Sequence, residues 1–593
     1  MSIEQAATKK TVVPRTAKDS TRDPITLAIV QKQLDHITHQ MGWVMTRTSR
    51  SPVFSESHDF SCFLGTKNGE VAAQADGLPI HSGAGGFALK ALIGSYSGDM
   101  SEGDIFILSD PYVAGGNHLP DWTIIKPVFI DGVLEGFAAN RAHQSDIGGG
   151  AAGTYNPEAT EIFHEGIRLP IMKLVERDKL RKDLWQLLLL NSRTPELLEG
   201  DLGAMLGSVN IGAERMLRVM KEDLGNGRGV DYLEGLLDYG EMRLRGEIAK
   251  LPDGSWHGED GSDTDCFVDI DVPVKVKATV AGDELIFDFT GSAPQVKGFK
   301  NSSLANTHSA VYVAVAAFFD ASIPRNGGTF RPVRIVAPQG TVVNALPPAP
   351  MTMNTIYPAT EIVYACWKAL AQVSPGSACA GWGKSAYGIS SGRKADGRAF
   401  VMYHWHATPA GGAVNGRDGY AQGGNLPSLG GRTMPNVETY ERLYPCRIHK
   451  HELRCDSAGP GEYRGGSSVN YEAEVLVPST HAVRAEGLKR TSGYGVLGGG
   501  AGAKGSIVMQ EEGGELQRPP QYIIQRVGPM RVWIEGTAGG GWGDPKKRDP
   551  LRVLRDVRDE IVSVQSARDL YGVVIDPTGR NIDAAATKAL RGG

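Results

Sequence analysis

Cysteine is scarce in this chain of 593 residues: there are six, and no two are separated by only two residues. This pattern excludes a zinc site built from paired C-x-x-C motifs and argues against a disulfide framework, so it predicts a reducing compartment. Long apolar runs are missing as well, since none approaches the roughly 18 residues that a membrane-spanning helix needs. Residues 1–22 lack the apolar segment of a secretory signal. We therefore expect a cytoplasmic protein with no membrane partner.

Neither sign of charge dominates, because 62 Lys and Arg residues face 67 Asp and Glu residues, a formal net charge of −5. This balance gives no electrostatic reason to expect nucleic acid as a partner.

A complete phosphate-binding loop is also missing. Gly383-Lys384-Ser385 matches the end of G-x-x-x-x-G-K-[ST], but Ala378 stands where the first glycine belongs. We therefore expect this chain alone neither to bind ATP tightly nor to hydrolyse it.

Glycine, by contrast, is abundant, with 76 residues, about twice its usual share. Its clusters at 498–502 and 539–543 are most simply explained by tight β turns. The one match to the nucleophile motif G-x-S-x-G, Gly388–Gly392, is followed by a polar stretch and then a strand-like run, which predicts a Gly/Ser loop. Two histidine pairs with i,i+2 spacing are interpreted as surface or interface residues, with a second metal site as the alternative: His404/His406 and His449/His451.

The spacing of apolar residues predicts the secondary structure. Asp23-Pro24 is a typical helix start, and an apolar stripe then runs to Val44 over almost five turns. Residues 59–75 predict a hairpin with a type I′ turn at Asn68-Gly69, and Pro127 predicts that a strand near it is an edge. Further expected elements are a helical stretch at 180–250, strands at Cys266–Val274 and Glu284–Thr290, a helix at Thr360–Val373 and a helix from Asp549-Pro550 to about Tyr571.

This order of elements lacks the strand–helix alternation of a doubly wound sheet. We expect an α+β fold of several layers, with largely antiparallel sheets, an inserted helical region and a Gly-rich C-terminal β region. The predicted regions are a disordered tail (1–22), an N-terminal α/β region with the candidate site (23–175), a helical region (176–254), a middle α+β region (255–390), the Gly-rich β region (391–548) and a C-terminal helix and tail (549–593).

The most informative segment is a second predicted hairpin, in which strands at 123–130 and 133–141 flank the turn Asp131-Gly132. Without a bulge, paired residue numbers sum to 263. His143 then falls opposite Pro120, and His118 is its diagonal neighbour on the same face, roughly 7–8 Å away. Asp121 and Asp146 have the other parity and join only if the chain bends at the strand ends.

Two His-x-x-Asp motifs therefore meet at this hairpin. His118, His143, Asp121 and Asp146 are candidate ligands for one divalent ion, of zinc, manganese or iron, because imidazole and carboxylate groups commonly bind these metals. The alternative is an Asp–His hydrogen-bonded pair that stabilises the loop ends. Asp59, His81 and Glu161 are candidates for the residues around the ligands. Glu165 and His164 are interpreted as solvated or structural.

Several short motifs stand in order between residue 23 and about residue 575. They are Arg50-Ser-Pro, Asp59-Phe-Ser-Cys, Gly115-Gly-Asn-His-Leu-Pro-Asp, Asn140-Arg-Ala-His with Asp146-Ile-Gly-Gly, Thr160-Glu-Ile, Pro324-Arg-Asn-Gly-Gly, Asp456-Ser-Ala-Gly-Pro-Gly-Glu-Tyr-Arg-Gly-Gly and Gly539-Gly-Gly-Trp-Gly-Asp-Pro. Together these motifs resemble the hydantoinase B/oxoprolinase family. The resemblance implies a metal site on the matched histidines and aspartates, and an A-type partner subunit that uses ATP to phosphorylate the substrate.

On this resemblance we expect a subunit that hydrolyses a cyclic amide such as a hydantoin, oxoproline or lactam, with Asp121 and Asp146 as ligands or as the base that orients water. A ketone carboxylase subunit of the acetone or acetophenone type is the alternative, and a non-enzymatic scaffold is a third class. The helical stripe and the Leu-rich stretch at 180–250 must bury their apolar faces somewhere. They predict a homodimer within a larger hetero-oligomer, unless they pack on their own sheets.

Overall fold

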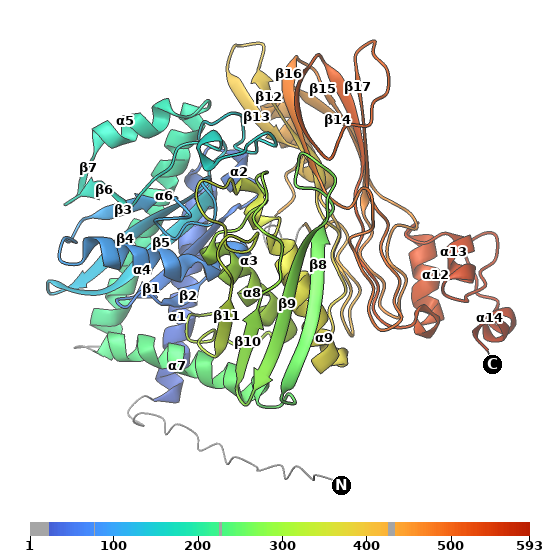
Figure 1. The fold of residues 1–593 in the computed structure, drawn as a ribbon, viewed down its shortest axis with the longest axis horizontal. Coiled ribbons are helices and arrows are strands. Elements are labelled where there is room, and N and C mark those ends of the chain that lie inside the picture. Colours follow the sequence, from blue (N-terminus) through green and yellow to red (C-terminus); the bar gives the residue numbers. More distant parts are fainter. Residues whose placement is uncertain (1–22, 76, 225–227, 425–432, 593) are drawn as a thin grey trace, which may run out of the picture.

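The computed structural model describes residues 23–592 except 76, 225–227 and 425–432, so the predicted tail at 1–22 lies outside the described residues. Four sheets with helices packed around them form its body (Figure 1). Within the described residues, no helix is long and apolar enough to cross a membrane. The mixed architecture, in which most neighbouring strands are antiparallel, confirms the predicted α+β class.

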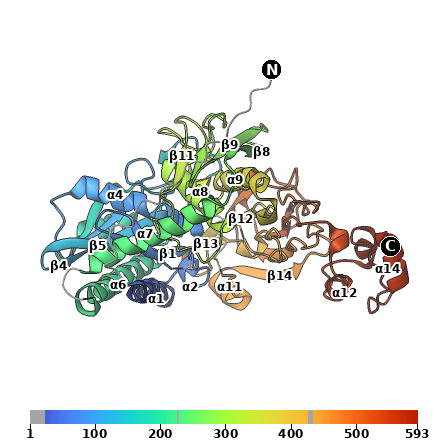
Figure 2. The ribbon, with the colours of Figure 1, turned by 90° about the horizontal axis from the view of Figure 1, so that it is seen from below.

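The largest sheet has seven strands in the order β2-β1-β5-β4-β3-β6-β7, and its neighbouring strands are antiparallel. Helices α1 and α6 pack against one face (Figure 2), and α4 packs against the other. As a result, all seven residues of β1 are buried. The strands are β1 (Phe60–Thr66), β2 (Val71–Gln74), β3 (Ile105–Leu108), β4 (Asp121–Ile130), β5 (Val133–His143), β6 (Met172–Glu176) and β7 (Lys179–Leu180).

Helices surround this sheet in the places that the sequence predicted. Asp23 caps α1 and Pro24 begins it. Its apolar stripe is buried against α6 and the sheet, although at the far end Met45 rather than Val44 is fully buried. The helices are α1 (Pro24–Thr48), α2 (Pro52–Ser55), α3 (Pro79–Gly83), α4 (Gly85–Tyr96), α5 (Lys182–Leu190), α6 (Pro195–Arg218) and α7 (Arg228–Ile248).

Both predicted hairpins form, but only one has the predicted turn. Asp131 and Gly132 have φ of 50° and 81°, as a type I′ turn requires. In the β1–β2 hairpin, Gly69 has a φ of 80° but Asn68 is not left-handed, and the Gly69 N–H donates to the Thr66 carbonyl. The type I′ prediction is therefore wrong there, because a single left-handed glycine closes a longer turn.

A β-bulge changes the register of the β4–β5 hairpin. Pairing begins as predicted beside the turn, but Val128 faces Gly136, which leaves one extra residue on β5. Asp121, rather than Pro120, therefore faces His143. The predicted register is wrong by one residue over most of the hairpin, because the pattern of apolar residues does not reveal the bulge.

Two smaller strand predictions are also wrong. Pro127 lies in β4, an inner strand, but β3 pairs with β4 only up to Ile125, so no ladder bond to β3 is needed at the proline. The strand expected from Cys266 begins only at Val272. Asp265 explains the difference, because its carboxylate accepts hydrogen bonds from two of the next three backbone N–H groups and forms a turn.

A second layer packs two long helices against a four-stranded sheet of order β11-β10-β9-β8. In β9, buried and more exposed residues alternate, as expected for a sheet covered on one face. The elements are β8 (Gly254–Ser262), β9 (Val272–Ala281), β10 (Glu284–Asp288), β11 (Val333–Val336), α8 (Leu304–Phe318) and α9 (Ala359–Val373).

The C-terminal part contains two further four-stranded sheets whose inward residues share one hydrophobic cluster, followed by small helices at one end of the molecule (Figure 1). One sheet comprises β12 (Ala386–Arg393), β13 (Ala399–Tyr403), β16 (Ser479–Ala485) and β18 (Tyr522–Val527), and the other β14 (Cys446–Leu453), β15 (Val469–Val475), β17 (Ser506–Glu511) and β19 (Met530–Glu535). The helices at that end are α12 (Pro550–Arg558), α13 (Val564–Asp569) and α14 (Ala584–Arg591), so the helix predicted to reach Tyr571 is broken in two. A further short helix, α11 (Val437–Leu443), comes before β14 and packs against it.

The glycine clusters are not mainly tight turns, which corrects the prediction. Residues 539–541 have no positive φ, and they hydrogen-bond to neighbouring glycine-rich segments. A Cβ atom on Gly540 would lie 1.9 Å from the Tyr494 carbonyl oxygen, and one on Gly539 the same distance from the Gly411 oxygen. Glycine is required here because backbones pack directly against each other.

Candidate metal centre

Three side chains with metal-binding atoms converge where β4 begins and β5 ends. Asp121 and His143 face each other across the strand pair, and His118 lies in the turn before β4. His118 Nε2 is 2.8 Å from Asp121 Oδ1, and His143 Nδ1 is 3.1 Å from the same oxygen. One ligand atom from each residue lies within 4.8 Å of the other two. This spacing suits a single ion held among them.

The orientation of His118 is fixed by the backbone. Its Nδ1 lies 2.5 Å from the Thr352 carbonyl oxygen, which can only accept, so Nδ1 donates and Nε2 keeps its lone pair for the site. Glu165 holds this segment, because its carboxylate accepts hydrogen bonds from the backbone of Met351 and Thr352. Glu165 is fully buried, not solvated, and burial raises its pKa to about 7.

Asp59 and His81, two of the predicted surrounding residues, lie beside this group and are buried. His81 Nε2 is 3.1 Å from Asp121 Oδ2 and 3.9 Å from Asp59 Oδ1. Burial alone would raise the pKa of Asp121, but His118 and His81 hold that pKa well below its usual range. In Asp59 burial outweighs the neighbouring histidines and raises the pKa. The site thus keeps Asp121 as a carboxylate and disfavours charge on Asp59.

The buried polar atoms test whether a metal ion fits. Asp121 Oδ2 is buried and accepts no well-aligned hydrogen bond, although His81 Nε2 lies 3.1 Å from it; buried polar atoms are rarely left unsatisfied. Imidazole nitrogens and a carboxylate are a donor set that zinc, manganese and iron accept. His118, Asp121 and His143 can therefore hold a divalent ion.

The other two predicted residues do not join the group. Both oxygens of Asp146 already accept hydrogen bonds, from the backbone of Gly148, Gly153 and Arg193 and from the Arg193 guanidinium. Its carboxylate secures the loop after β5, which corrects its expected place among the ligands. Glu161 is exposed and does not line the site.

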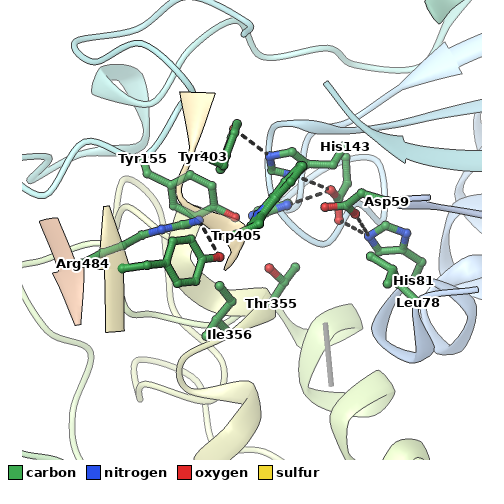
Figure 3. Close-up of a pocket in the computed structure, with 13 residues that line it drawn as sticks. Asp59, Leu78, His81, His143, Tyr155, Thr355, Ile356, Tyr403, Trp405 and Arg484 are labelled. Carbon is green, nitrogen blue, oxygen red and sulfur yellow. Dashed lines mark hydrogen bonds and ion pairs between the residues drawn. The ribbon is translucent and has the colours of Figure 1, made fainter. Parts of the chain in front are cut away.

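Residues distant in the sequence line the rest of a small pocket around this group (Figure 3). Tyr155 stacks on His143 with 5.8 Å between ring centres, and the Tyr403 hydroxyl lies 3.4 Å from His143 Nε2. The sequence reasoning missed this wall, because no short motif marks its residues. They are Tyr155, Thr355, Ile356, Tyr387, Tyr403, Trp405 and Arg484.

A second histidine cluster lies inside the C-terminal sheets. Ser390 Oγ is 2.9 Å from His404 Nε2 and 2.9 Å from His481 Nδ1. His404 and His406 are buried, so their interpretation as surface residues is wrong, whereas His449 is exposed. Ser390 belongs to strand β12, so the loop predicted for the G-x-S-x-G match is also wrong. Burial lowers the pKa of both bonded histidines, that of His481 to about 4.

Comparison with known proteins identifies the family. The sequence profile of the hydantoinase B/oxoprolinase family matches residues 23–545. The chain belongs to this family. Within it, caprolactamase subunit beta from Pseudomonas jessenii is 33% identical over 590 residues, which cover 96% of this chain and 99% of that protein.

Two further similarities lie within the same family. The crystal structure of ATP-dependent caprolactamase from Pseudomonas jessenii superposes with a TM-score of 0.87 at 32% identity, covering 97% of this chain and 100% of that one. The 5-oxoprolinase PfmaA of Pestalotiopsis fici is 26% identical over 92% of this chain, but over only 43% of its own length. The resemblance seen in the sequence motifs is thereby confirmed.

Proposed function

We propose that this chain is the metal-binding B-type subunit of an ATP-dependent cyclic amide hydrolase that acts with a separate A-type, ATP-using subunit. The observation that carries the proposal is the similarity, over nearly the full length of both chains, to a subunit of a caprolactamase. The match to 5-oxoprolinase adds support, since more than half of that enzyme lies outside the match and leaves room for an ATP-using part.

In the proposed reaction the partner subunit phosphorylates the amide oxygen of a lactam, hydantoin or oxoproline, and water then attacks the activated carbon. His118, Asp121 and His143 hold the divalent ion, which when bound polarises oxygen ligands and lowers the pKa of water. Asp121 contacts both ligand histidines and so helps to hold them in place, together with the Thr352 carbonyl on His118. The buried aromatic wall keeps bulk water away from the reacting groups.

The test is co-expression with an A-type subunit, followed by measurement of ADP release and ring-opened product with caprolactam, a hydantoin, 5-oxoproline and acetone as substrates. We expect ADP release that depends on one of the cyclic amides. Asp121→Asn should lower turnover at least about 100-fold, the range reported for loss of one catalytic group. Asp183→Asn on the exposed surface of α5 is the matched control and should leave turnover unchanged.

The dependence of turnover on bicarbonate distinguishes the hydrolase from the alternative, a ketone carboxylase. Turnover of acetone that requires bicarbonate, with no turnover of any cyclic amide, would replace the hydrolase proposal with the carboxylase. If ADP release responds to none of these substrates and the chain binds no metal, the scaffold class is favoured.

A further inference from the structure

Arg484 is a buried cation in the wall of the pocket. It lies on strand β16, its side chain is only 3% exposed, and it lines the same cavity as His143 and Asp59. Figure 3 shows it on the side of the pocket opposite His81 and Asp59. A ligand of the metal centre therefore has a positive charge within the same enclosed space.

No carboxylate in the described part of the chain lies within 4 Å of this guanidinium, and its bonds to neutral groups are few. Nη2 donates to the Tyr387 hydroxyl at 2.9 Å, Nη1 lies 4.0 Å from Met353 Sδ, and Nε has no partner. The guanidinium carbon is 3.5 Å from the centre of the Tyr155 ring and 4.7 Å from that of Tyr387. The aromatic rings hold the side chain in place but do not neutralise its charge.

Three other buried cations in the described part of the chain are more fully paired than Arg484. Lys300 pairs with Glu486 at 2.7 Å, and Lys384 pairs with Glu361 at 2.7 Å. Arg141 has no carboxylate partner, but its guanidinium donates to side-chain and carbonyl oxygens through Nε, Nη1 and Nη2. A buried charge is costly unless it is paired. An unpaired Arg484 that faces a cavity therefore indicates an anion as the missing partner.

We propose that Arg484 binds an anionic oxygen group of the ligand in this pocket. Under the proposed function, on which this assignment rests, the group is either the phosphate of the activated amide or the carboxylate released by ring opening. A planar guanidinium suits both, because it offers parallel N–H donors to two oxygens. Tyr155 connects the two ends of the site, since it stacks on His143 and lies against Arg484.

The experiment uses the full chain without a partner subunit and after removal of metal with a chelator. Calorimetric titrations with inorganic phosphate and, separately, with acetate distinguish the two sources of the anion. We expect the wild type to bind at least one of them. Arg484→Met should weaken that binding at least tenfold. Arg484→Lys should weaken it about threefold or more, because lysine keeps the charge but lacks the parallel N–H donors of the guanidinium. Arg552→Met on α12 is the control and should bind like the wild type.

Arg484→Lys decides the question if Arg484→Met does not fold, which circular dichroism would reveal. The proposal is overturned if the wild type binds neither anion, or if the folded Arg484 variants bind them as tightly as the wild type does. The result is independent of the hydrolase assay. If the complex opens a cyclic amide but the chain binds neither anion, the hydrolase proposal stands and only the role of Arg484 is disproved. If the wild type binds an anion and the Arg484 variants do not, the role of Arg484 is supported even when no cyclic amide is turned over.

Discussion

Asp121 reaches the centre of the site because of one extra residue on β5. The bulge beside Gly136 shifts the ladder so that Asp121 faces His143, and the carboxylate then lies between the imidazoles of His118 and His143. In the unshifted register the side chains of Asp121 and His143 would lie on opposite faces of the sheet, since a slip of one residue exchanges the two faces. Asp146, in the matching motif beyond the strand end, is held by Arg193 instead.

The metal content tests this assignment residue by residue. We expect about one divalent ion per chain, as such ligand sets usually hold, and its loss in the His118→Ala/His143→Ala double variant. Asp146→Asn is the matched control. It should retain the ion but lower the free energy of unfolding by about 1–3 kcal/mol, because buried hydrogen bonds to Arg193 and the loop are weakened.

Elemental analysis and urea unfolding of the same preparations give both quantities. Full metal retention in the double histidine variant would contradict the assignment of the metal centre. Loss of metal from Asp146→Asn would return Asp146 to the ligands.

At the scale of elements, the glycine-rich segments of the C-terminal part act as close-packed strands of backbone. Gly540→Ala should destabilise the fold by about 3 kcal/mol, the upper end of the usual cost of overpacking, because the new Cβ would meet a carbonyl oxygen that cannot move aside. Gly203→Ala in α6 is the control, since no atom lies within 4 Å of its Cβ position. That change should stabilise by roughly 0.5–1 kcal/mol through helix propensity.

Denaturant midpoints of the two glycine variants would measure the contrast. Equal stability of Gly540→Ala and the wild type would mean that these backbones are not in contact.

The junction between α6 and the chain after α1 depends on a buried carboxylate. Asp201 accepts hydrogen bonds from the backbone of Arg50 and Ser51, and burial raises its pKa to about 6. Its folded-state pKa lies above the unfolded value, so its ionisation destabilises the fold as the pH rises from about 4 to above 6.

Asp201→Asn keeps an acceptor oxygen and removes the charge. Its free energy of unfolding should exceed that of the wild type by up to ~3 kcal/mol at pH 7, and by about half as much at pH 5. Urea unfolding at both pH values checks this. A gain that is larger at pH 5 than at pH 7 would contradict the assigned pKa.

At the scale of the whole molecule, the apolar stripe of α1 no longer argues for a homodimer, because it is buried against α6 within the chain. A different face of α1 is our candidate for such a contact. Ile25, Ile29 and Trp43 are 71%, 54% and 54% exposed, and their spacing puts them on one side of the helix. Large apolar side chains gathered on one exposed face often mark an interface.

We predict a homodimer within the complex with the A-type subunit, formed in part by this face of α1. Light scattering of the complex should give a mass with two copies of this chain. Ile29→Glu should reduce that to one copy without loss of metal, whereas Leu570→Glu, a change at an exposed leucine outside α1, should not. A single copy of this chain in the wild-type complex would count against the homodimer.

The sequence alone determined those features that depend on neighbours along the chain. The Asp23 cap, the stripe of α1 and the Asp131-Gly132 turn follow from local spacing and turn chemistry. The family motifs were equally legible in linear order. Only the tertiary structure decided the rest. The bulge that centres Asp121, the burial of Glu165 and the placement of Arg484 beside Tyr155 depend on packing between segments far apart in the chain. The periodicity of apolar residues along the sequence does not predict such contacts, because burial and pairing are properties of the assembled layers rather than of any one element.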